Sequence, residues 1–289
     1  MRSSLLATAA VSVLLSACAG TASNSVMMAD GNTNVGAHPL TIVPMGEYRT
    51  GMLDESAAEI PAFDPETKRI FVVNGADKAI DILDMSNPDE LTKVGVITLS
   101  TWGKGANSVA IMNGVVAVAV ENADKQASGQ AVFFNTDGDF ISAVTVGALP
   151  DMIKFSPDGK HVLVANEGEP NDAFTNDPEG SVSIISLSGG VDGLSDSDVR
   201  TVDFTFLNNA DLPYGMRTSN PGTSSVAQDV EPEYIAVSKD SKTAYVSLQE
   251  NNAVAIIDIE TASVKRVAGF GFKDHSVHAF DASDKDGKI

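Results

Sequence analysis

The sequence predicts an all-β protein, a β-propeller of four-stranded blades in which about four blades are present and the ring is incomplete. Three observations favour this fold class. A hairpin pattern recurs along the chain, a second strand pair follows each hairpin, and no amphipathic helix longer than three turns can be found. Because units of roughly 40 to 50 residues are typical of propeller blades, the repeat decides the architecture.

The hairpin pattern is clearest in residues 62–74 and 153–166. Each copy has a short apolar strand, a turn rich in Pro, Asp, Gly or Lys, and a second strand of β-branched residues that ends in Asn. The unit returns at 235–248 and, more weakly, at 109–120. Four hairpins of one design indicate four blades.

A second strand pair is expected after each hairpin. Phe63, Ile111 and Phe155 occupy equivalent positions and are 48 and 44 residues apart, whereas the fourth repeat follows after 82. The surplus falls largely in 168–180 and 206–228, which are polar and predict long loops at the blade edges. The expected strand pairs are 79–85 with 93–99, 130–135 with 140–146, 181–187 with 199–204, and 253–259 with 263–270. A single helical turn is expected at most, at 54–59.

The first residues predict a lipoprotein signal. Arg2 precedes an apolar stretch, residues 5–15, that is too short to span a bilayer. The run Leu15-Ser16-Ala17-Cys18 resembles a lipobox, in which the cysteine is lipidated after cleavage, and Cys18 is the only cysteine in the chain. We expect the lipid on Cys18 to attach the protein to a membrane. The alternative is an ordinary signal peptide with an incidental cysteine.

Three segments follow from this interpretation. They are a signal peptide at 1–17, a lipidated cysteine with a flexible tether at 18–39, and the propeller domain at 40–289. Ala19 after the cysteine is the residue type usually passed to the outer membrane, so we expect an outer membrane lipoprotein in the cell envelope, facing either the periplasm or the exterior.

The charge excludes one class of partner. The chain has 39 acidic and 19 basic residues, a formal net charge of -20, and this excess repels the phosphate backbone of nucleic acids. Cations, in contrast, concentrate where carboxylates converge.

Acidic and amide side chains gather just after the second strand of several hairpins and just before the first. Equivalent positions of different blades share one face of a propeller, so these side chains could form a ring of oxygen ligands that suits Ca²⁺. The alternative is a set of solvated turn acids. The candidates are Glu55, Glu59, Glu121, Asp151, Asn166, Glu167, Glu231, Glu233 and Glu250, with Glu167, Glu231 and Glu233 as the expected metal ligands.

Other patterns are weaker. His275 and His278 have a spacing that zinc sites use but lack a third ligand nearby, and residues 281–287 form only a broken calcium-loop motif. Arg49 and Arg217 could hold a phosphate beside a metal, or could be salt-bridged surface residues. No Gly-x-Ser-x-Gly motif supports a hydrolase triad.

The turn and strand at 156–166 resemble the repeats of YVTN and WD40-like surface propellers. The longer motifs at 48–60, 165–171, 228–235 and 248–253 resemble the choice-of-anchor I family of exported bacterial proteins, from about Leu40 to Ile289. The resemblance implies a propeller held at the cell surface by one of several anchors. Some relatives carry an alkaline-phosphatase-like label, and members are usually longer.

Two functions are therefore expected. The first is a surface-anchored lipoprotein that binds a polar ligand, a cation or a protein partner at the acidic end of the propeller. The alternative, which the resemblance implies, is a calcium-dependent, alkaline-phosphatase-like phosphoesterase. Because the last residues, 281–289, offer no strand to close the ring, we also expect a shortened form of a longer protein.

Overall fold

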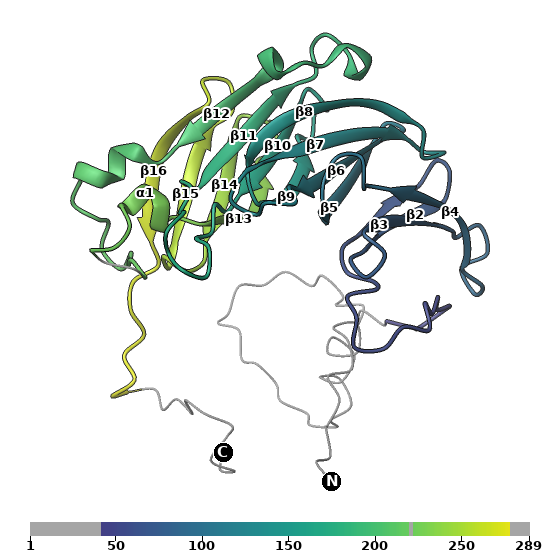
Figure 1. Cartoon of the computed structure of the whole chain (residues 1–289), viewed down its shortest axis with the longest axis horizontal. Helices are drawn as coiled ribbons and strands as arrows, with labels where there is room; N and C mark the ends of the chain where they lie inside the picture. Colours follow the sequence, from purple (N-terminus) through teal and green to yellow (C-terminus); the bar gives the residue numbers. More distant parts are fainter. Residues whose placement is uncertain (1–41, 220–221, 278–289) are drawn as a thin grey trace, which may run out of the picture.

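The computed structural model describes residues 42–219 and 222–277, which form four antiparallel four-stranded sheets (Figure 1). Blade 1 contains β1 (Pro61–Asp64), β2 (Arg69–Asn74), β3 (Ala79–Asp84) and β4 (Thr92–Thr98). Blade 2 contains β5 (Gly105–Met112), β6 (Val115–Glu121), β7 (Ser128–Asn135) and β8 (Phe140–Ala148). Blade 3 contains β9 (Pro150–Phe155), β10 (His161–Asn166), β11 (Ser181–Ser186) and β12 (Val199–Asp203). Blade 4 contains β13 (Pro232–Val237), β14 (Thr243–Leu248), β15 (Ala253–Asp258) and β16 (Ser263–Gly269).

The blades are arranged as in a β-propeller. Within each blade the strands pair in chain order, and the first strands contact one another from blade to blade, β1 with β5, β5 with β9 and β9 with β13. Figure 1 shows the four blades following one another along an arc. The predicted fold class and strand pairs are confirmed, with strand ends within a few residues of those expected.

The hairpin turns explain why the repeat is visible in the sequence. Ser156 Oγ donates to Asp158 Oδ1 at 2.7 Å, and the equivalent Ser238 Oγ donates to Asp240 Oδ1 at 2.7 Å. Short polar side chains that bond within their own turn favour the turn over a continued strand. The same local chemistry therefore ends the first strand of blades 3 and 4.

Three apolar cores lie between the blades. Successive residues of a strand point to opposite faces of the sheet, so each central strand contributes to two cores. Fully or nearly fully buried members are Phe71 and Phe134 between blades 1 and 2, Phe133 and Phe155 between blades 2 and 3, and Leu163 and Ile235 between blades 3 and 4. Burial on both faces holds each inner blade against its neighbours.

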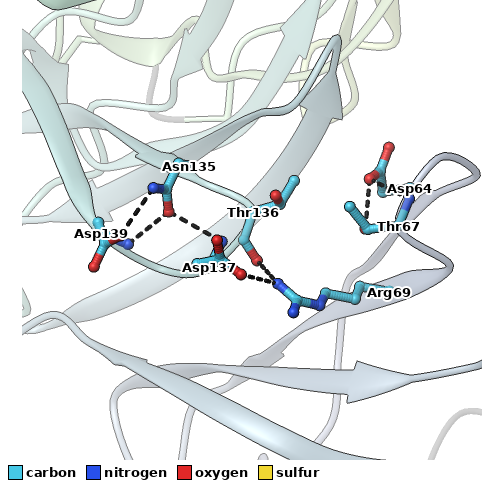
Figure 2. A network of polar contacts seen from close by, with 7 residues as sticks. All are labelled: Asp64, Thr67, Arg69, Asn135, Thr136, Asp137 and Asp139. Carbon is cyan, nitrogen blue, oxygen red and sulfur yellow. Dashed lines mark hydrogen bonds and ion pairs between the residues drawn. The ribbon is translucent and has the colours of Figure 1, made fainter.

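Polar contacts also join the first two blades (Figure 2). Arg69 Nη1 donates to the carbonyl oxygen of Thr136 at 2.6 Å and is ion-paired with Asp137 Oδ1 at 2.6 Å. Asn135 accepts from the backbone N–H of Asp137 and of Asp139, which fixes the turn that receives the arginine. These bonds lie at the end of the blades where β1 turns into β2.

Little of the described chain is helical. Residues 54–59, where at most one helical turn is expected, contain bends but no helical turn, and this segment follows the end of β2, where Glu59 N–H donates to the carbonyl oxygen of Val73. The predicted long loops are present and hold the 3₁₀ turn η4 (Thr205–Asn209) and the single-turn helix α1 (Val226–Asp229). Two further 3₁₀ turns, η2 (Val191–Gly193) and η3 (Asp196–Asp198), precede β12. Among the described residues, no helix has the length and hydropathy needed to cross a bilayer.

Candidate ligand-binding site at the acidic mouth

The sheet register brings the predicted acidic positions to one end of the blades. Asn166 at the end of β10 lies opposite Pro150 at the start of β9, and Leu248 at the end of β14 lies opposite Pro232 at the start of β13. Acids that flank these positions therefore lie at the same end of adjacent blades. We call Asp151, Glu167, Glu169, Glu231, Glu233 and Glu250 the acidic mouth.

Glu167 has the most perturbed carboxyl of this group. Its burial, followed by the charges of Asp151, Glu169, Glu233 and Glu231, raises its pKa from 4.5 to about 8. A carboxylate that loses hydration and faces other carboxylates favours its protonated form. Near neutral pH, Glu167 therefore keeps its proton for much of the time.

The blade 4 acids behave in the same way. Burial, and then the charge of Glu250, raise the pKa of Glu231 and that of Glu233 to about 7. Burial followed by the charge of Glu169 also raises the pKa of Asp151. The shifts connect acids of blades 3 and 4 into one interacting set.

Lys125 brings a positive charge to the mouth from blade 2. Its ammonium is ion-paired with Glu169, and this hydrogen bond is the main reason that the pKa of Lys125 is raised. The charges of Glu167 and Glu121 contribute to the same shift. One lysine thus compensates part of the negative charge and ties the blade 2 loop to the blade 3 loop.

Glycines let the loop after β10 pass through a narrow space. Gly168 has a φ of +75°, which residues with a side chain rarely adopt, and a Cβ there would lie 2.8 Å from the carbonyl oxygen of Pro178. At Gly180 a Cβ would lie 1.8 Å from the carbonyl oxygen of Val230. These close approaches hold Glu167 and Glu169 beside the segment that carries Glu231.

The two long loops also bond to each other. Gln228 Nε2 donates to the carbonyl oxygen of Asp177 at 2.6 Å, and Ser224 Oγ donates to the Asp177 carboxylate. Ser225 caps α1 by accepting from Gln228 N–H at 3.2 Å. Insertions about fifty residues apart in the sequence are therefore joined by hydrogen bonds.

Buried amides fix the blade 4 side. Asn251 Nδ2 donates to Asp229 Oδ2 at 3.0 Å and to the carbonyl oxygen of Arg217 at 3.2 Å. Arg217 Nε donates to the carbonyl oxygen of Glu250 at 2.6 Å. Arg217 thus braces the backbone beside Glu250. Arg49 forms an exposed ion pair with Glu47 at 2.9 Å, which is the salt-bridged alternative expected for this residue.

Not every predicted residue joins the mouth. Glu55 and Glu59 are exposed and precede blade 1, and no shift or bond described for the mouth acids involves them. Glu121 is ion-paired with Lys104 at 3.4 Å. Asn166 is fully buried and its Nδ2 donates to Ser181 Oγ at 3.2 Å, so this amide braces blade 3.

Three side-chain oxygens at or near the mouth are buried without a hydrogen-bond partner among the described residues: Asn166 Oδ1, Asp177 Oδ1 and Glu250 Oε2. Buried polar atoms are normally satisfied, so such oxygens call for a donor or a cation. No three His, Cys, Asp or Glu side chains of the described residues are placed to hold a metal ion as they stand. Calcium ligation by Glu167, Glu231 and Glu233 stays a prediction.

Three expectations lie outside the described residues. They are lipidation of Cys18, the contribution of His278 to a pair with His275, and the broken calcium loop at 281–287.

Sequence reasoning missed Glu169, Asp177 and Lys125. Glu169 lies inside the quoted motif at 165–171, and the Glu-Gly-Glu spacing could have indicated it. Asp177 and Lys125 lie in loops, and only the contacts between loops bring them to the mouth.

The comparisons with known proteins agree with this architecture. A model of the choice-of-anchor I domain matches residues 59–289. The chain belongs to the choice-of-anchor I family. Among curated proteins, none matches this choice-of-anchor I chain.

Solved structures are similar to the choice-of-anchor I chain, and the likeness to the first one named here supports the fold alone. Hydrazine synthase of Kuenenia stuttgartiensis is 19% identical, with a TM-score of 0.51, 77% of this chain covered and 52% of that one. The Cps50 (Swd1) β-propeller domain of Myceliophteria thermophila is 10% identical, with a TM-score of 0.48, 74% of this chain covered and 56% of that one. The chain thus spans little more than half the length of these structures.

Proposed function

We propose that the chain is a non-catalytic binding protein of the cell envelope whose acidic mouth takes a cationic or polar ligand, with Ca²⁺ as the first candidate. The observation that carries the proposal is the pair of buried, unpartnered carboxylate oxygens, Glu250 Oε2 and Asp177 Oδ1, beside carboxyls that repel one another. A bound cation would satisfy these oxygens and lower the repulsion. Flexible oxygen ligation suits Ca²⁺ better than metals that demand a fixed geometry.

Proton competition gives the proposal a specific signature. The pKa of Glu167 is about 8 and that of Glu231 is about 7, so a cation must displace protons from these carboxyls at neutral pH. Binding should therefore strengthen between pH 6 and pH 9, and calcium addition should release protons. Those pH values are chosen to lie about one unit to either side of the two carboxyl pKa values.

The test measures unfolding of the full chain in CaCl₂, in MgCl₂ and in buffer at both pH values. A ligand at about 100 times its Kd stabilises the folded state by about 2.7 kcal/mol, which a shift of the thermal midpoint reveals. Glu231→Gln should weaken the calcium response at pH 9, and Glu66→Gln, in the exposed turn between β1 and β2, should not. No calcium response, or equal responses of both variants, would contradict a cation site here.

The phosphoesterase that the family resemblance implies has a separate readout. Release of phosphate from a generic phosphomonoester by the full chain, dependent on Ca²⁺ and lost in Glu167→Gln, would favour an enzyme over a binding protein. The arginines do not favour it, because Arg217 is bonded to the Glu250 carbonyl and Arg49 to Glu47.

The anchor belongs to the same proposal. We expect the lipid on Cys18 to hold the propeller at the outer membrane, and Cys18→Ser should move the protein from the detergent phase to the aqueous phase in a partition experiment. Equal partition of both forms would count against lipidation.

A further inference from the structure

A groove lies between the outer strands of blades 3 and 4, and no residue of the acidic mouth lines it. β12 and β16 are the outermost strands of their blades and run side by side (Figure 1). The groove encloses about 330 Å³, which is at the lower end of the range for small-ligand pockets, about 300–1,000 Å³. Residues 201–203 and 206 form the blade 3 wall, and residues 262–264 form the blade 4 wall.

An arginine of the chain fixes the two walls of the groove to each other. Arg200 Nη1 donates to the carbonyl oxygen of Glu260, and Arg200 Nη2 donates to that of Ile259 at 3.0 Å. These bonds tie β12 to the turn before β16. Val202, which is 2% exposed, gives the lining an apolar part that packs into the protein. The positions of both walls are therefore set before any ligand binds.

Asp203 places a carboxylate in this groove. Its Oδ1 accepts from the Thr205 hydroxyl and from the backbone N–H of Thr205 at 2.9 Å, and these bonds lower the pKa of Asp203. Within the described chain no ion pair includes Asp203, and no hydrogen bond involves its Oδ2. Lys265, just after the blade 4 wall, is already paired with Asp258 at 2.7 Å. The described residues thus hold a negative charge here without a cation to balance it.

Phe206 offers an aromatic ring to the same groove. It is 49% exposed, whereas Phe204, two residues earlier, is fully buried. The face of an aromatic ring attracts cations, and the cation is more often an arginine than a lysine. Thr201 and Ser263 add a hydroxyl acceptor on each wall. A carboxylate, an aromatic ring and hydroxyls around one groove match the planar, multiply donating guanidinium group.

We propose that this groove binds an arginine side chain of a partner protein, at a site separate from the acidic mouth. The guanidinium stacks on Phe206 and donates to Asp203 Oδ2. The formal net charge of -20 attracts basic surfaces and favours such a partner. Lysine fits less well, because its ammonium is a compact, strongly hydrated charge that cannot form a planar stack.

The experiment titrates N-acetyl-arginine amide into the ¹⁵N-labelled full chain, with Cys18→Ser to prevent lipidation, and follows the backbone amide signals by NMR. A single residue should bind with a Kd on the order of 1 mM, and the signals of residues 201–206 and 262–264 should shift. N-acetyl-citrulline amide has nearly the same shape but no charge. It should bind at least about tenfold more weakly.

Two substitutions test the groups that contact the arginine. Asp203→Asn should weaken binding about tenfold and Phe206→Ala about threefold, as expected for the loss of a charged hydrogen bond and of a cation–π contact. Asp240→Asn is the matched control and should leave the Kd unchanged. Asp240 is an exposed turn acid that accepts from Ser238 Oγ at 2.7 Å, much as Asp203 accepts from the Thr205 hydroxyl.

Several results would overturn the proposal. No shift at about 10 mM probe excludes the site, and shifts only around Glu167 and Glu231 place the arginine at the acidic mouth instead. Equal Kd values for the arginine and citrulline probes remove the role of charge. An unchanged Kd in Asp203→Asn or Phe206→Ala removes the groove. The citrulline comparison uses the unaltered groove, so it decides the outcome even where a variant fails to fold.

Discussion

Replacing Glu167 with glutamine tests whether burial and the neighbouring carboxyls raise the pKa of this acid in the folded chain. The pKa of Glu167 is raised from 4.5 to about 8, chiefly by burial and then by Asp151 and Glu169. The folded state therefore holds this proton more tightly than the unfolded state. The resulting stability is complete below about pH 4.5, falls as the pH rises, and is lost above about pH 8.

The magnitude follows from the two pKa values. Their difference corresponds to at most about 5 kcal/mol of unfolding free energy. Because the Glu167 side chain stays partly exposed, solvent screening reduces this to about 2 kcal/mol. Glutamine has the shape of the protonated acid, so the variant should match the wild type at pH 5 and exceed its stability by about 2 kcal/mol at pH 9.

Urea unfolding at pH 5 and pH 9 measures the difference directly. Glu66→Gln serves as the matched control, because this acid is exposed in a turn far from the mouth in sequence and at the other end of its hairpin. Parallel pH profiles for the wild type and Glu167→Gln would refute the raised pKa of Glu167 and the burial and repulsion that explain it. An equal gain in Glu66→Gln would instead indicate a general effect of net charge.

Two further predictions concern the scaffold. Gly168→Ala should lower the unfolding free energy by about 1–3 kcal/mol and weaken the calcium response, because alanine tolerates the φ of +75° poorly. The control Gly189→Ala, at a glycine with open space around it, should change little. Thermal unfolding with and without CaCl₂ measures both variants. Phe133→Ala should lower the unfolding free energy by about 3–5 kcal/mol, because it leaves a cavity between blades 2 and 3. Replacing the half-exposed Phe206 with alanine should lower it little, and urea unfolding measures both.

The strands could be predicted because their signals are local. The turns at Ser156 and Ser238 bond within themselves, so the hairpins are encoded in a few consecutive residues. The helix α1 was missed although its signal is also local. Ser225 and Gln228 form a reciprocal capping box, a pattern that indicates a helix start in the sequence. The polar composition of the surrounding segment favours a loop instead, so the sequence predicts no helix there.

The mouth could be predicted only where the repeat sets the position. Glu167 and Glu250 follow the second strands of blades 3 and 4, so register alone brings them to one end. Lys125 and Asp177 depend on contacts between loops, and no periodicity encodes such contacts. A ligand role for Glu55 and Glu59 stays a prediction, since the shifts described for the mouth involve acids of blades 3 and 4.

The recurring amides and acids occupy similar positions in the sequence repeat but have different surroundings in the structure. Asn74 and Asn166 end a second strand and Asn251 follows one. All three are buried, and their side-chain N–H groups bond to neighbouring loops or strands. Their recurrence is explained by the scaffold. Glu167 and Glu250 stand close in sequence to two of these amides, but burial and neighbouring carboxyls dominate the mouth acids: burial and then acidic neighbours raise the pKa of Glu167, Glu231 and Glu233. Holding these acids together costs stability once they are ionised, and under the proposed function a bound cation would lower that cost.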